Sequence, residues 1–195
     1  MTMRKHNRRT AMLLVLALAL ALFAAPAAAQ EAAAELEGGI TWDTTVEQML
    51  AAEGATANDN LNTYGVGDFL QYGFDHNTGD VDAGFLYYIF KNDSLVMYGK
   101  NVVLSYLPEG TEMNAFIDGL VAQFTQRYGE PVYTDAQLFA DALNTMEEGA
   151  VKPEDVDTFT GWDAGGGTDL YLVTHGGDSL IYVYVNKPLL SAQGA

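Results

Sequence analysis

Two residues whose types could perform nucleophilic chemistry, His175 and Ser179, lie four positions apart near the end of the chain. A serine acts as a nucleophile when a nearby base accepts its proton, and a carboxylate commonly orients that base. Both residues flank the turn of a predicted hairpin, and the local sequence specifies no orienting carboxylate. We therefore predict no catalytic residue, and keep a hydrolase using Ser179 and His175 as an alternative.

The residues around Ser179 read Gly177-Asp178-Ser179-Leu180, which resembles the nucleophile block of a lipase and esterase family. In that family the serine follows the first parallel strand, and its Asp and His partners lie near the end of the domain. Here the block lies in the last hairpin, so too little chain follows to supply the partners. We interpret the match as a coincidence.

Oxygen-bearing side chains suited to a hard cation occur at Asp75, Asn77, Asp80 and Asp82. An EF-hand requires glycine at loop position 6 and a bidentate acid at position 12. Asp80 and Leu86 stand at those positions, so the segment fails as an EF-hand. No metal site and no cofactor are predicted, and a calcium-stabilised extracellular structural protein is kept as a second alternative.

Four tyrosines in predicted strands are the candidate binding residues: Tyr87, Tyr171, Tyr182 and Tyr184. If they share the sheet face away from the helices, they form an exposed aromatic patch suited to protein or glycan contact. Tyrosine is also a good strand former whatever its function, so an ordinary sheet would contain it too.

Short runs of β-branched and aromatic residues bounded by turn residues predict the strands that carry these tyrosines. The last strand alternates, with Ile181, Val183 and Val185 on one face and Tyr182 and Tyr184 on the other. The predicted strands lie within residues 69–74, 84–90, 95–98, 101–107, 160–163, 169–174 and 180–185. These runs predict an antiparallel sheet of five or six strands.

Apolar residues at helical spacing predict helices that cover this sheet. Thr44 with Glu47 has the spacing of a capping box. A buried stripe runs from Met113 to Tyr128 and stops at Gly129, and a second stretch covers residues 138–146. The aliphatic face of the last strand should meet these helices. The predicted fold is therefore α+β, with helices packed on one face of the sheet.

The first 29 residues have the three-part pattern of a cleavable export signal. A basic start with four Lys and Arg residues precedes an uncharged Leu-rich run, and the run ends in Ala27-Ala28-Ala29. The dense apolar part is shorter than the ~20 residues of a membrane-spanning helix. We predict cleavage after Ala29, a linker over 30–39 and a single domain over 40–190, located in the periplasm or secreted.

The chain after residue 29 is very acidic and lacks cysteine. It holds all 26 Asp and Glu residues but five of the nine Lys and Arg residues, a net charge of −21. Such a surface repels phosphate backbones and anionic lipids, which disfavours nucleic acid and, after signal cleavage, membrane partners. Basic proteins, cations or neutral ligands are the expected partners. Solubility in a salty or extracellular medium explains the same charge.

The order of features resembles the small α+β modules of the β-lactamase-inhibitor-protein-like and SmpA/OmlA-like groups. It runs from Trp42 through a short capped helix, a β-meander, a helix closing on Tyr128-Gly129-Glu130-Pro131, and Trp162, to a terminal hairpin. The resemblance implies interaction with another extracytoplasmic protein. The membrane-assembly members are lipoproteins, and this chain lacks the cysteine they need. We expect an exported, non-catalytic interaction module with an open sheet face.

Overall fold

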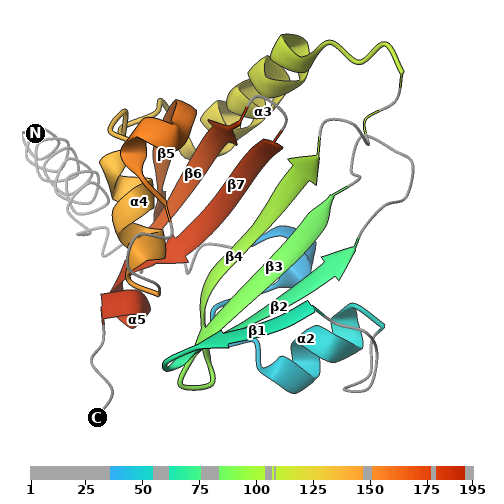
Figure 1. Cartoon of the computed structure of the whole chain (residues 1–195), viewed down its shortest axis with the longest axis vertical. Coiled ribbons are helices and arrows are strands. Elements are labelled where there is room, and N and C mark those ends of the chain that lie inside the picture. Colours follow the sequence, from blue (N-terminus) through green and yellow to red (C-terminus); the bar gives the residue numbers. More distant parts are fainter. Residues whose placement is uncertain are drawn as a thin grey trace, which may run out of the picture. The chain divides into compact units, whose positions relative to one another are not determined.

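A seven-stranded antiparallel sheet forms the centre of the computed structural model, in the order β1-β2-β3-β4-β7-β6-β5 (Figure 1). The structure describes residues 36–54, 62–75, 84–103, 107, 109–146, 151–176 and 179–191. Its strands are β1 (Asn62–Val66), β2 (Phe69–Asp75), β3 (Phe85–Lys91), β4 (Ser94–Val103), β5 (Val156–Gly165), β6 (Thr168–His175) and β7 (Ser179–Asn186). The predicted α+β class with an antiparallel sheet is confirmed.

The sheet has seven strands, whereas five or six were predicted. The additional strand is β1, part of which falls in a stretch that reads as loop because it is rich in Asn, Asp and Ala. Its sequence, Asn-Thr-Tyr-Gly-Val, has little alternation of apolar and polar residues. Pairing with β2 stabilises it as a strand, which a local sequence pattern cannot reveal.

Tight hairpins set the register of the two halves of the sheet. Asn92 and Asp93, which join β3 to β4, both have positive φ, as a two-residue turn between twisted strands requires. Strands β5 and β6 are joined through glycines at positive φ, Gly166 among them. Pairing of β4 with β7 then joins the halves into one sheet.

One face of the sheet is covered by α2 (Val46–Ala52) and α3 (Met113–Tyr128). Phe124 is fully buried in α3 and packs edge-on against Trp162 and Tyr182. The helix ends at Gly129, as predicted. The capping box of α2 lies one residue later than predicted, because Thr45 and Gln48 exchange the two reciprocal hydrogen bonds.

The opposite face carries α4 (Gln137–Asn144) and α5 (Lys187–Ser191), so the prediction of helices on one face alone is wrong. Phe139 and Ala142 of α4 and Leu190 of α5 share a cluster with Val183 and Val185 of β7. The predicted contact between the aliphatic face and helices is thus present. The tyrosine face is covered as well, because tyrosine rings are apolar enough to form a second core.

The segment before α2 belongs to the fold, although residues 30–39 were predicted to be a linker. A 3-10 turn, η1 (Glu37–Gly39), lies between the buried side chains of Leu36 and Ile40. The buried Trp42 donates from Nε1 to Thr168 Oγ1 at 2.8 Å. The buried side chains of Leu36, Ile40 and Trp42, together with this hydrogen bond, hold the chain on the sheet from Leu36 onward. A second 3-10 turn, η3 (Pro153–Asp155), precedes β5.

Candidate functional site

The four predicted binding tyrosines do not form one exposed patch. The strand register puts Tyr87 and Tyr171 on the α4/α5 face, whereas Tyr182 and Tyr184 lie on the α2/α3 face. Tyr171, Tyr182 and Tyr184 expose 3%, 6% and 0% of their surface. Only Tyr87 remains half-buried. The exposed-patch prediction is therefore corrected: three of the four tyrosines are core residues.

A lateral row of tyrosines crosses the α2/α3 face of the sheet. Tyr72, Tyr88, Tyr98 and Tyr184 occupy directly opposed positions on β2, β3, β4 and β7. The ring centroids of Tyr88 and Tyr98 lie 5.1 Å apart, and those of Tyr98 and Tyr184 lie 6.2 Å apart. Cross-strand aromatic pairs of this kind stabilise a sheet beyond the area they bury.

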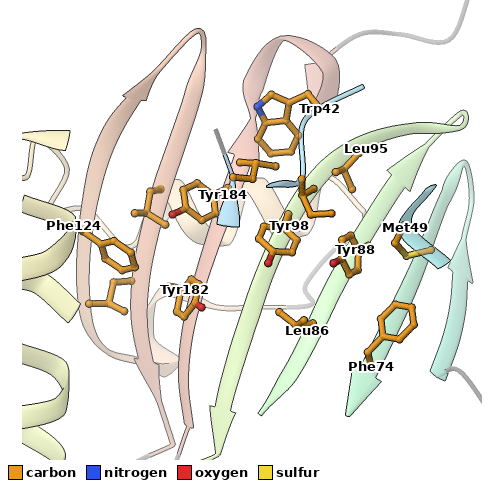
Figure 2. Close-up of a cluster of buried hydrophobic side chains, with 14 of the residues drawn as sticks. Trp42, Met49, Phe74, Leu86, Tyr88, Leu95, Tyr98, Phe124, Tyr182 and Tyr184 are labelled. Atoms are coloured by element: carbon orange, nitrogen blue, oxygen red, sulfur yellow. The ribbon is translucent and has the colours of Figure 1, made fainter. Parts of the chain in front are cut away.

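Two glutamates accept hydrogen bonds from tyrosines on this face of the sheet. The Tyr182 hydroxyl donates to Glu37 Oε2 at 2.7 Å, and the Tyr88 hydroxyl donates to Glu53 Oε1. The Tyr184 and Tyr128 hydroxyls share a hydrogen bond of 3.2 Å. In Figure 2 the hydroxyl oxygens of Tyr88, Tyr98 and Tyr182 point into the same part of the cluster. We name Glu37, Glu53, Tyr88, Tyr98 and Tyr182 the tyrosine–glutamate cluster.

The environment keeps these phenols protonated. Burial is the main cause that raises the pKa of Tyr88, Tyr98, Tyr182 and Tyr184, and the neighbouring carboxylates raise those of Tyr88, Tyr98 and Tyr182 further. A phenol with a raised pKa is a poor general base and a poor nucleophile at neutral pH. The phenols of Tyr88 and Tyr182 therefore act as hydrogen-bond donors to the two glutamates.

These raised pKa values predict alkaline unfolding. Above pH 10, the ordinary pKa of tyrosine, the unfolded chain releases protons that these four folded tyrosines retain. Stability is fully present below that pH and falls above it, by about 1.4 kcal/mol per pH unit for each tyrosine that stays protonated. Urea unfolding at stepped pH, with tyrosinate absorbance recorded in parallel, checks this. Ordinary titration of all tyrosines in the intact fold would contradict it.

On the α4/α5 face, a buried carboxylate ties three elements together. Asp169 of β6 accepts hydrogen bonds from Tyr171 at 2.8 Å and from Tyr133 at 3.1 Å, and it pairs with Lys187 at 2.9 Å. Burial, followed by the bond to Asp169, raises the pKa of Tyr171. We name these four residues the Asp169 clamp. It fastens α5 and the segment around Tyr133 to the sheet.

Tyr87 shares a lateral row with Tyr171 but has different surroundings. Tyr171 is covered by Phe159 and by Tyr133, which bridges to Gly161 at the edge of β5. Tyr87 lies between two glycines, Gly73 on β2 and Gly99 on β4. A Cβ added to Gly99 would lie 2.5 Å from the Tyr182 carbonyl oxygen, so no side chain fits beside the Tyr87 ring there.

Four half-buried residues lie near Tyr87 on the same face: Gln71, Phe85, Asn101 and Val103. Tyr87 and Val103 belong to neither of the two hydrophobic clusters. Asn101 bonds the Tyr87 hydroxyl, while its buried Oδ1 has no partner in the described part of the chain. We name Gln71, Tyr87, Asn101 and Val103 the β2–β4 section.

The register places His175 directly opposite Ser179, across the β6–β7 hairpin. His175 is exposed and Ser179 is half-buried. Val156 and Val103 continue this row on β5 and β4, so its strand neighbours supply no carboxylate. Of the predicted calcium ligands, Asn77, Asp80 and Asp82 lie outside the described residues, and Asp75 ends β2.

Across the described ranges, no group of three or more His, Asp or Glu side chains is placed to hold a metal ion. Among the same residues, no helix has the length and apolar character needed to cross a membrane. No family model matches the chain, and comparisons with curated proteins and with solved structures found no match.

Proposed function

We propose that this chain is an exported, non-catalytic module that binds another extracytoplasmic protein through the β2–β4 section. The observation that supports the proposal is the position of Tyr87. It is the one predicted binding tyrosine that remains half-buried, and it belongs to neither of the two hydrophobic clusters through which the described helices pack on the sheet. Aromatic side chains that are partly exposed on rigid strands are typical anchors of protein interfaces.

The charge of the chain favours a basic partner. Four of the five basic residues after residue 29 are engaged within the fold. Lys91 donates to the Leu190 carbonyl at 2.7 Å, and Lys187 pairs with Asp169. Arg127 stacks on Tyr128, and Lys100 is buried. Most of the acidic charge is therefore uncompensated, which would speed association with a basic protein and weaken it at high salt.

A photo-crosslinking amino acid at position 87 tests this proposal in the extracytoplasmic fraction of the source cells. We expect one partner to be captured from positions 87 and 103. Controls at Tyr72, half-buried on the opposite face of β2, and at the exposed Val132 should not capture it. Purified wild-type protein should compete, whereas Tyr87→Ser protein should not. Equal capture from all four positions would refute the proposed surface.

The hydrolase alternative keeps one supporting observation, the opposition of His175 and Ser179 in the strand register. It requires an orienting carboxylate and oxyanion donors in addition. The calcium alternative depends on residues outside the described ranges. The resemblance to β-lactamase-inhibitor-protein-like and SmpA/OmlA-like modules stays a prediction that agrees with a binding role.

A further inference from the structure

We propose that the outer edge of β1 binds an extended basic peptide, which adds to the sheet as a further antiparallel strand. The sheet ends in β1 on one side and in β5 on the other (Figure 1). The outward N–H and C=O groups of an edge strand pair readily with the backbone of another chain. The site adjoins the β2–β4 section but does not depend on it, because the β1 backbone would make the hydrogen bonds.

The hairpin register shows which backbone groups of β1 face outward. A two-residue turn, Gly67-Asp68, joins β1 to β2, and its glycine has positive φ. The pair that closes such a turn, here Val66 and Phe69, is hydrogen-bonded, and bonded and open pairs then alternate along the ladder. The N–H and C=O groups of Thr63 and Gly65 therefore point away from β2. Gly65 is exposed, and no strand among the described residues pairs with β1 on this side.

The opposite edge, β5, is protected in ways that β1 is not. The register between β5 and β6 shifts twice, and the backbone of Val132 and Tyr133 bonds to Gly161 on the outer side of β5. β5 also carries the exposed Asp157 and Asp163. Bulges, charges and a covering segment are the usual protection of an edge against pairing. In contrast, β1 has no charged residue, no proline and an unbroken register with β2.

Charge favours a basic peptide over a second copy of this chain as the occupant. The chain after residue 29 has a net charge of −21, so two copies repel each other. Two exposed aspartates, Asp68 and Asp93, lie in adjacent turns near the Val66 end of β1, because the Asp68 carbonyl accepts from the Asn92 N–H at 3.3 Å. An antiparallel strand would place its N-terminal end beside these turns. A lysine or arginine there would be attracted by both carboxylates.

A synthetic peptide that alternates threonine and valine, with two lysines at its N-terminal end, tests the site on the ¹⁵N-labelled full-length protein. We expect saturable binding at pH 7 that slows amide hydrogen exchange of Gly65 at least about tenfold. The amide of Gly161, which already donates to the Tyr133 carbonyl, should not change. The same peptide with every threonine and valine N-methylated should not bind, because it lacks the N–H donors. Glutamates in place of the lysines should weaken binding.

The variant Gly65→Pro removes the outward N–H of β1 without removing a β1–β2 bond, and Gly65→Ala is its matched control. A Cβ at position 65 would lie 3.7 Å from Leu70 and Phe69, an ordinary contact, so both side chains fit. Proline should weaken binding at least about tenfold, and alanine should change it little. If Gly65→Pro fails to fold by circular dichroism, the N-methylated peptide on the wild-type protein decides.

The variant Tyr87→Ser/Val103→Ser separates this site from the proposed protein contact. It should bind the peptide like the wild type, because it leaves the β1 backbone intact. Loss of peptide binding in this variant would overturn the edge site in favour of the β2–β4 section. Equal binding of the N-methylated peptide, an unchanged Gly65 amide, or a Gly65 amide that a second copy already protects before the peptide is added would each overturn the proposal as well.

Discussion

Replacing Trp162 with alanine is expected to lower the free energy of unfolding by about 3–5 kcal/mol, the usual cost of removing a buried Trp or Phe side chain. Trp162 exposes 0% of its surface and is among the largest fully buried side chains of the described residues. Its ring packs edge-on against Phe124, with centroids 5.5 Å apart. Alanine would leave a cavity where α3 docks on β5. Urea denaturation followed by circular dichroism measures the loss.

Two further variants make this result specific. Trp162→Phe should cost less than alanine, because it keeps an aromatic ring and removes an indole N–H that has no partner among the described residues. Val132→Ala should change little, since Val132 is 60% exposed. A loss of less than about 1 kcal/mol for Trp162→Ala would contradict the docking of α3 on this part of the sheet.

Replacing Asp169 with alanine is expected to have the second largest effect, a loss of about 2–3 kcal/mol. The substitution removes the acceptor of two tyrosine hydroxyls, and hydrogen bonds to a charged group contribute about 1.5–3 kcal/mol. The buried Tyr171 hydroxyl would then lack its partner. Thermal and urea unfolding measure the change, and loosening of α5 should appear as faster amide exchange after Asn186.

Lys187→Met separates the ion pair from the tyrosine bonds of the Asp169 clamp. The Lys187 side chain is 49% exposed, so solvent screens the pair, and its removal should cost less than about 1 kcal/mol. Asp163→Asn is the surface control, because Asp163 lies opposite Asp169 in the register but is exposed. If Lys187→Met were as harmful as Asp169→Ala, the ion pair would be the main contribution and our account of the clamp would be wrong.

Sequence patterns predicted the elements better than their arrangement. The stripe from Met113 to Tyr128 is a helix with its buried side chain at Phe124, and Gly129 ends it. The terminal hairpin also forms as predicted. Which face a helix covers depends on contacts far apart in sequence, which local periodicity does not encode. The near-continuous apolar run of β7 did indicate that helices cover both faces, because strands that are buried on both faces have such runs.

The true positions of the four tyrosines could not be predicted, because a sequence shows which side chains share a face only within one strand. Tyr182 and Tyr184 necessarily share a face, but the face of Tyr171 depends on the register of the hairpin, which pairs it with Val183. The role of Glu37 was missed for a similar reason. It lies 145 positions from Tyr182, and only the folded chain brings them together.

The most direct test of the central claim is the affinity of the captured partner for the Tyr87→Ser/Val103→Ser variant. We predict at least about a tenfold loss relative to the wild type, as for a truncated anchor of an interface, with far-UV circular dichroism unchanged. Tyr72→Ser, which removes a ring from the opposite face of the same strands, should bind like the wild type. Unchanged affinity in the double variant, or an equal loss in Tyr72→Ser, would contradict recognition through the β2–β4 section.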